Sequence, residues 1–175
     1  KFKSIFPEKD NNRERIVITP NKDPMLNINL PQGIEKLNDT EIEDNLGKIA
    51  KSANIKNDIS VYLNQASSSE LLALKVKRNF NQSLEIVIPS VEEKSTSTRI
   101  LLLVEEDAKL DLLQIFIGDN NSAQNHLIEI KLGSKVEFNH GLISLGEELE
   151  SSSICTVAVE QAEKSKYSLH SIHHG

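Results

Sequence analysis

The sequence has no tryptophan, one cysteine, five phenylalanines and two tyrosines among its 175 residues. With so few aromatic side chains, the core must be built from Ile, Leu and Val. The single cysteine, Cys155, excludes a disulfide framework and is typical of a reducing compartment. Basic residues are not in excess: 26 Asp and Glu against 20 Lys and Arg give a net charge of −6. Nonspecific nucleic-acid binding is therefore disfavoured, because it needs positive charge to displace counterions from phosphates.

Long apolar runs are also missing. The longest pure run, Ile100 to Val104, is far shorter than the ~18 residues of a membrane-spanning helix. Lys1 to Phe6 lacks the apolar segment of a signal peptide. These features predict a soluble, cytoplasmic protein of one domain with a small cap at most. Because the chain starts without Met and stops at Gly175 just after a strand-like run, we expect it to be a fragment of a longer protein.

Residues 1–35 are expected to form an extended lead-in. They hold four of the five prolines, and proline neither donates to a β-ladder nor fits inside a helix. Two short apolar pieces in this stretch, Ile16 to Ile18 and Leu26 to Leu30, are candidates for edge strands.

Residues 36–70 are predicted to form a helical cap. Asn38 followed by Glu41 matches a capping box, and Asp58 is a candidate N-cap for a second, short helix. One apolar stripe at helical spacing predicts a single first helix, which Gly47 weakens by about 1 kcal/mol; the stripe consists of Ile42, Leu46, Ile49 and Ala53.

From Leu71 onward the apolar period is two, which is typical of strands. Strand follows strand with short polar turns between them, and no helical stripe occurs after residue 70. This pattern excludes a βαβ architecture and leaves a sandwich, a barrel or a β-solenoid.

An internal repeat favours the solenoid. Residues 108–112 match residues 134–138, which lie 26 positions on, and residues 165–169, a further 31 on. A recurrence of roughly 20–30 residues is typical of one coil of a parallel β-solenoid. The alternative, a meander of hairpins, would favour Asn-Gly or Asp-Gly turns, which the sequence lacks. We therefore predict an all-β fold, a parallel β-helix over residues 71–175, with a corner at the change of apolar phase between Leu112 and Leu113.

An ordered series of segments resembles the SufB/SufD family, the β-helical subunits of the SUF iron–sulfur cluster assembly complex. The resemblance covers about residues 36–175, and the lead-in and small cap are more similar to the SufD branch. The segments that carry it are 63–66 (Leu-Asn-Gln-Ala), 71–76, 84–88, 99–110 and 129–136.

The resemblance implies a right-handed parallel β-helix behind an N-terminal cap, and a scaffold rather than an enzyme. It implies a SufB-like partner and a SufC-like ATPase, with an Fe–S cluster and reduced flavin belonging to the full complex only. The cysteine and histidine positions that the family uses for cluster assembly lie in a half beyond Gly175. We therefore expect no catalytic, cofactor-binding or metal-binding residue in this chain. We also expect the fragment to self-associate through the exposed edge of its last coil.

Histidines supply the one metal-like cluster in the sequence, His170, His173 and His174. On a strand, positions 170 and 174 share a face and 173 lies on the other, so a polar strand end is favoured over a metal site. His126 and His140 are expected on neighbouring coils, at solvated positions.

Cys155 is expected to be a buried structural residue, because a reactive thiol needs an electropositive, accessible setting. The nearest charges in sequence, Glu150 and Glu160, would raise its pKa.

Four carboxylates suggest an alternative function. If Asp107, Asp111, Glu129 and Glu137 lined one side of the β-helix, the chain would resemble a secreted, carbohydrate-active β-helix protein, which needs two carboxylates of unlike pKa. Outward acidic residues are the commoner explanation. A β-solenoid binding module without a metal role is a further alternative. The glycines form no phosphate-binding motif such as GxxxxGK.

Overall fold

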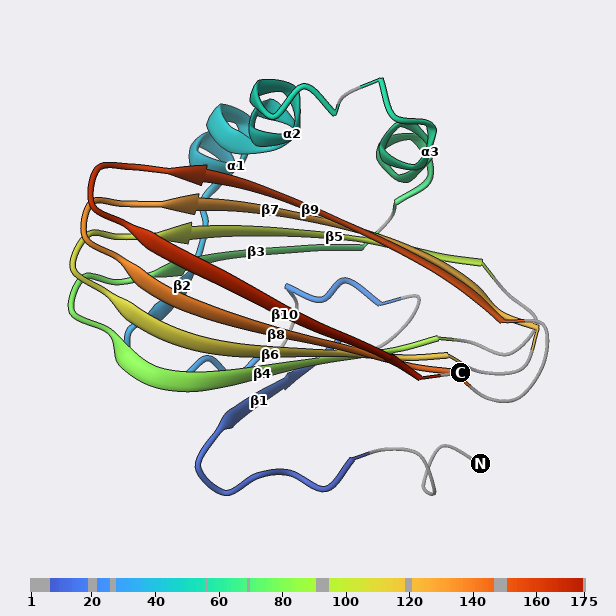
Figure 1. The fold of residues 1–175 in the computed structure, drawn as a ribbon, viewed down its shortest axis with the longest axis horizontal. Helices are drawn as coiled ribbons and strands as arrows, with labels where there is room; N and C mark the ends of the chain where they lie inside the picture. Colours follow the sequence, from blue (N-terminus) through green and yellow to red (C-terminus); the bar gives the residue numbers. More distant parts are fainter. Residues whose placement is uncertain are drawn as a thin grey trace.

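The computed structural model describes residues 7–18, 22–25, 28–55, 57–68, 70–90, 95–118, 121–146 and 151–174. Within them, helices occur before residue 70 and strands dominate the rest (Figure 1). The helices are α1 (Asp39–Asn45), α2 (Lys48–Ser52) and α3 (Ile59–Ser67). The strands are β1 (Glu14–Val17), β2 (Ile34–Lys36), β3 (Glu70–Val76), β4 (Asn81–Pro89), β5 (Ser95–Val104), β6 (Lys109–Ile117), β7 (Ala123–Leu132), β8 (Glu137–Leu145), β9 (Ser152–Gln161) and β10 (Lys166–His174).

The strands form two sheets. Sheet A has the order β1-β4-β6-β8-β10 and sheet B the order β2-β3-β5-β7-β9. Every neighbouring pair is parallel except β2 with β3. From β3 on, the chain alternates between the sheets, so that each consecutive pair of strands forms one rung of a parallel β-solenoid (Figure 1). This confirms the predicted parallel β-helix and excludes the hairpin meander, in which consecutive strands would pair antiparallel.

Inward-facing Ile, Leu, Val and Phe side chains of both sheets form one continuous core. The outer face of sheet B is apolar too, because Leu101 and Leu127 pack beneath the helices, against Ile49 and Val61. Strands buried on both faces are apolar at consecutive positions, which explains the run Ile100 to Val104.

The corner predicted between Leu112 and Leu113 is wrong for the same reason. Strand β6 continues through both residues, with Leu112 in the core and Leu113 on the outer face of sheet A, beside Ile115. The apolar phase changes because the outer face becomes apolar, and the direction of the chain is unchanged.

The repeat is real, but its register differs from the sequence match. Lys109 pairs with Glu137, and Glu137 with Lys166, which gives steps of 28 and 29 residues in place of 26 and 31. The corners between sheet B and sheet A explain the difference. Each contains one residue with left-handed backbone, φ of 59–62°, and these four residues are Asn79, Asp107, Lys135 and Lys164. Lys135 is therefore equivalent to Asp107, whereas the sequence match had placed it opposite Lys109.

We expect Lys135→Gly to stabilise the protein by about 0.5–1 kcal/mol. A side chain at positive φ costs about 1–2 kcal/mol, which exceeds the entropy that glycine adds to the unfolded chain. The 3.8 Å ion pair of Lys135 with Asp107 is exposed and contributes little. Urea denaturation measures the effect, with Lys109→Gly, at the first residue of β6, as a control that should destabilise. A loss of stability in Lys135→Gly would show that the corner is unstrained.

The cap follows the prediction at its helix starts. Asn38 and Glu41 form the predicted capping box at α1, and Asp58 accepts a hydrogen bond from the amide of Ser60 at the start of α3. The prediction of a single first helix is wrong. Gly47 adopts φ +78°, which ends the first helical segment and begins α2, because glycine lacks the Cβ that penalises this conformation.

One end of the solenoid is covered and the other is open. Strand β1, predicted around Ile16, covers β4, and β2 covers β3. The other proposed edge strand is absent at residues 28–30, and Leu26 and Asn27 lie outside the described residues. Among the described strands, none pairs with the outer edges of β9 and β10. No helix in the described part of the chain has the length and apolarity needed to cross a membrane.

Candidate functional site

The rung formed by β9 and β10, called here the open rung, has an incompletely covered interior. Its inward residues Cys155, Val157 and Tyr167 pack on the core but are only partly buried. Leu169, in register with the fully buried His140, is 43% exposed because no further rung covers it in the described structure. An open solenoid end with parallel backbone edges and apolar side chains favours association with another strand-bearing surface.

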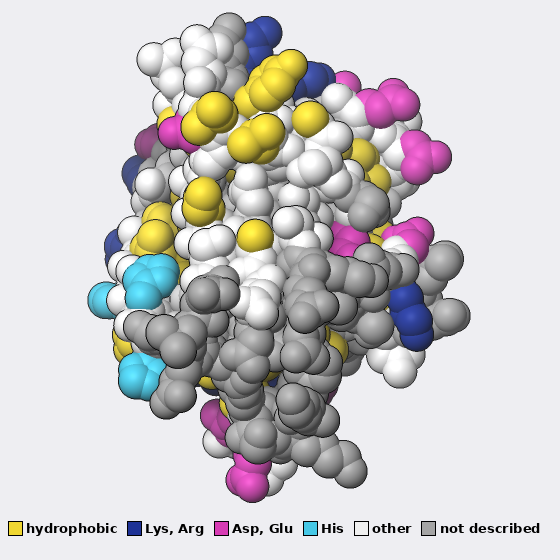
Figure 2. Space-filling view, turned by 90° about the vertical axis from the view of Figure 1, so that its right-hand side faces the viewer, with side chains coloured by type: hydrophobic (Ala, Val, Ile, Leu, Met, Phe, Trp, Pro, Cys, Tyr) yellow, Lys and Arg dark blue, Asp and Glu magenta, His cyan; other side chains and the backbone are white. Residues whose placement is uncertain are grey.

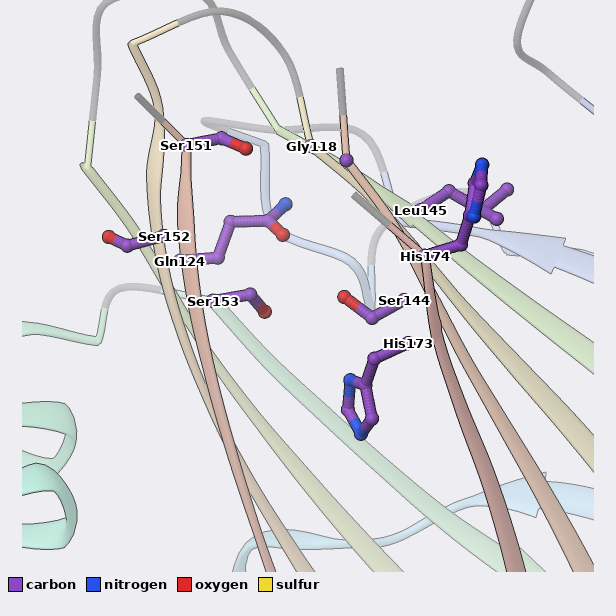
Figure 3. Close-up of a pocket in the computed structure, with 10 residues that line it drawn as sticks. Gly118, Gln124, Ser144, Leu145, Ser151, Ser152, Ser153, His173 and His174 are labelled. Carbon is purple, nitrogen blue, oxygen red and sulfur yellow. The ribbon is translucent and has the colours of Figure 1, made fainter. Parts of the chain in front are cut away.

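A pocket of about 240 Å³ lies between the two sheets at one end of the open rung. Ser153 and Gln124 enter it from sheet B, and Ser144 and His173 from sheet A (Figure 3). The amide of Gln124 is held by the carbonyl of Ile117 at 3.1 Å. The lining is rich in hydroxyl groups, and the ten lining residues include no carboxylate; they are Gly118, Gln124, Ser144, Leu145, Gly146, Ser151, Ser152, Ser153, His173 and His174. The pocket therefore offers hydrogen bonds and one imidazole to a small polar molecule.

The three terminal histidines lie on two faces of β10, as predicted. His173 points into the pocket, whereas His174 points away from it (Figure 3). His170 and His174 pair with Gly141 and Leu145 of β8 on the other face. Within the described residues, no group of three or more His, Cys, Asp or Glu side chains is arranged to hold a metal ion.

The structure differs from the predicted positions of His126 and His140. Both are fully buried, and they belong to the two strands of one rung, β7 and β8, not to neighbouring coils. His126 stacks on Phe116 across the core, with ring centroids 4.1 Å apart. The predicted solvated positions are wrong, because both histidines lie on the inward faces of their strands.

His140 belongs to a buried hydrogen-bond chain. Its Nε2 lies 2.6 Å from Oε1 of Gln114, and its Nδ1 lies 2.8 Å from the hydroxyl of Tyr167. Because Oε1 can only accept, Nε2 carries the proton and Nδ1 accepts from the tyrosine. This chain joins three rungs through β6, β8 and β10.

Burial makes the stability of the protein depend on pH. It lowers the pKa of His126 to about 3 and that of His140 to about 4. In the unfolded chain a histidine has a pKa of about 6.5, so below that pH the unfolded state binds protons that the folded state does not. This contribution to the free energy of unfolding is therefore fully present above pH 6.5. It is lost as the pH falls, by about 2 kcal/mol per histidine at pH 5.

Urea denaturation between pH 5 and 8 measures this dependence. His126→Phe keeps a ring against Phe116. It should reduce the slope of the unfolding free energy against pH by the amount that corresponds to about one bound proton. His170→Phe, at an exposed position, is the matched control and should leave the slope unchanged. An unchanged slope in His126→Phe would contradict the buried, neutral state of this histidine.

Cys155 lies on β9 and packs on the core, but it is only partly buried, where a buried position was predicted. Burial raises the pKa of its thiol to about 12. The cause is loss of solvation, not the glutamates cited in the sequence analysis; Glu150 lies outside the described residues. An uncharged thiol is a poor nucleophile.

The four carboxylates do not line one groove. Asp111 and Glu137 lie on the outer face of sheet A, where Asn139 donates to Asp111 at 2.8 Å. Lys109 and Lys166 hold the pKa of Glu137 below its usual value. Asp107 lies in a corner, and Glu129 lies on sheet B. Of the four, Asp111 and Glu137 line one pocket of about 190 Å³ together with Lys109. Because the lysines lower the pKa of Glu137, it does not suit the acid of raised pKa that a glycosidase needs, so the pair gives no support to that function.

Glu129 has a structural role that the sequence analysis missed. It is 1% exposed and lies beneath the cap, where it accepts hydrogen bonds from the amides of Gly47 (3.0 Å) and Ala50 (3.1 Å) and pairs with Arg99 (2.9 Å). The signal for it was a single acidic residue inside the apolar run from Leu127 to Ile130. A charge at such a position needs a buried partner.

Comparisons of the chain with protein-family models, with curated proteins and with solved structures find no match.

Proposed function

We propose that this chain is a scaffold subunit of a cytoplasmic iron–sulfur cluster assembly complex of the SUF type. It would pair with a SufB-like subunit and a SufC-like ATPase and would not be an enzyme on its own. The cluster and any reduced flavin would be properties of the assembled complex.

The order of the segments that resemble the SufB/SufD family supports the proposal. Residues 71–76 lie in β3, 84–88 in β4, 99–110 span β5 and the start of β6, and 129–136 span the end of β7 and the next corner. The resemblance is thus distributed over three successive rungs, as expected of a whole domain. The parallel β-helix behind a helical cap is the architecture that this resemblance implies.

The observation that carries the proposal is the placement of these segments, in order, on successive rungs of one parallel solenoid. The open rung is a feature of the 175-residue chain. It presents two long parallel strand edges and the exposed apolar side chains of Ile154 (51%), Leu169 (43%) and Ile172 (62%). Figure 2 shows hydrophobic side chains on the same side of the molecule as histidines, and others at the top, over α3. Unpaired edges beside apolar side chains favour self-association of the 175-residue chain.

Co-purification tests this proposal. The chain, within its intact open reading frame, is expressed with candidate SufB and SufC partners, and the purified complex is analysed for iron and acid-labile sulfide. We expect a stable complex that accumulates both. In the isolated 175-residue chain, Leu169→Lys, which places a charge on the open rung, should prevent self-association, whereas Val17→Lys should not. Val17 is the matched control because it is 44% exposed at the opposite end of the solenoid.

Failure of the wild-type chain to associate would contradict the proposal and would favour a β-solenoid binding module without a metal role. Circular dichroism of both variants must match the wild type, so that lost self-association reports the surface and not unfolding. The carbohydrate-active alternative lacks support from the carboxylates: Asp111 and Glu137 share a pocket, but Lys109 and Lys166 lower the pKa of Glu137.

The 175-residue chain by itself should self-associate through the open rung. Light scattering at micromolar concentration should show a dimer or larger species for the wild type and a monomer for Leu169→Lys. A monomeric wild type would contradict self-association while leaving the SufB-like partner to be tested by co-purification.

A further inference from the structure

Cys155 and His126 are neighbours inside the solenoid. They are in register on the adjacent parallel strands β9 and β7. Both side chains face the core: His126 stacks on Phe116 of the opposite sheet, and Cys155 packs on the core cluster. Side chains in register on neighbouring strands stand side by side, because the strands are ~4.8 Å apart.

His126 has an unsatisfied hydrogen-bonding capacity. It is fully buried, and neither of its ring nitrogens has a hydrogen-bond partner among the described residues. His140, equally buried, has a partner at each nitrogen. Buried polar groups are almost always paired, so an unpaired imidazole beside a thiol marks a candidate ligand site.

We propose that the sulfur of Cys155 and one ring nitrogen of His126 bind a single monovalent, soft metal ion, with Cu⁺ as its biological form. Thiolate sulfur and imidazole nitrogen are both ligands that copper accepts. A metal–sulfur and a metal–nitrogen bond together span about 4 Å, judged from zinc distances. That span is close to the spacing of the two strands.

A monovalent ion is favoured because it leaves no net charge buried in the core. Binding replaces the thiol proton, Cu⁺ + R–SH → R–S–Cu + H⁺, so the ion and the thiolate together are neutral and no net charge is buried. A structural zinc site needs four ligands and would leave a charge in the core. The described residues provide no third metal-binding side chain at this position. Burial keeps the pKa of His126 low, so its nitrogen lone pair is free at neutral pH.

The pocket at the open rung provides access. Ser153 and Gln124, which line it, are in register and precede Cys155 and His126 by two residues on the same inward face (Figure 3). An ion that enters the pocket would therefore reach the Cys155–His126 pair next along the strands.

Anaerobic titration with Cu⁺, against a chromophoric Cu⁺ chelator, tests the site in the purified chain. We expect one ion per chain and release of one proton. Removing outer-shell partners of a metal typically costs ~10–100-fold in affinity, so loss of a ligand in Cys155→Ser or His126→Phe should cost at least about 100-fold. His173→Phe, which changes the pocket but removes no proposed ligand, should bind normally.

X-ray absorption spectroscopy of the wild-type chain with bound Cu⁺ tests the site without relying on the variants. One sulfur and one nitrogen in a two-coordinate site would support the assignment. A site with three or more ligands, wild-type affinity in His126→Phe, or the absence of one-to-one binding would each overturn it.

Discussion

Glu129→Ala should destabilise the protein by about 3–5 kcal/mol, the range for breaking a buried ion pair on one side. The substitution leaves the guanidinium of Arg99, whose side chain is only 12% exposed, without its buried counter-charge. It also leaves the amides of Gly47 and Ala50, at the start of α2, without an acceptor. Because these bonds join the cap to sheet B, we expect the cap to loosen before the solenoid unfolds.

Urea denaturation measures the loss, and amide hydrogen exchange locates it. The amides of Gly47 and Ala50 should lose protection in Glu129→Ala, whereas amides in the core strand β5 should keep it. Glu160→Ala is the matched control: its ion pair with Lys131 spans 3.2 Å, but the glutamate is 44% exposed, so its removal should cost under about 0.5 kcal/mol. Equal losses in the two variants would show that Glu129 does not hold the cap.

Local signals in the sequence predicted local structure. The period-two pattern after Leu71 gave the strands, and the side chains of Asn38 and Asp58 marked two helix starts, because a capping residue acts within its own turn. The absence of helical stripes left a sandwich, a barrel or a solenoid, and the internal repeat together with the absence of hairpin turns favoured the solenoid. The positions of these elements depend on contacts between residues that are near in the chain.

Contacts between rungs were harder to predict. The exact repeat depends on the left-handed residue of each corner, and Asp107 and Lys135 share a backbone conformation without sharing chemistry. Glu129 finds its partners 79 and 82 residues away. The pairing of Cys155 with His126 depends on a 29-residue step, which the 26- and 31-residue spacings of the sequence match did not supply. An error of two residues in register preserves the face of a strand but changes every neighbour.

Gly133→Ala should destabilise the protein by about 2–3 kcal/mol, in the range of overpacking a closely packed site. A Cβ built on Gly133 would lie 2.7 Å from the amide nitrogen of Glu106 and 3.0 Å from the carbonyl oxygen of Val104. These atoms are backbone of the preceding rung, to which Gly133 also donates a 2.8 Å hydrogen bond. The clash can be relieved only if two stacked corners separate. Thermal and urea denaturation measure the effect.

Gly141→Ala is the matched control, since its nearest obstacle is the Cδ1 atom of Leu113 at 3.1 Å, the mobile end of a side chain. It should change stability by less than about 1 kcal/mol, because a leucine can change rotamer where backbone cannot. The equivalent corner positions of the neighbouring rungs, Glu105 and Ala162, carry side chains and make the same stacking hydrogen bond. If Gly133→Ala were neutral, this corner would be able to follow the path of its neighbours. A loss of 2–3 kcal/mol would instead show that close stacking at Gly133 is a fixed feature of the solenoid.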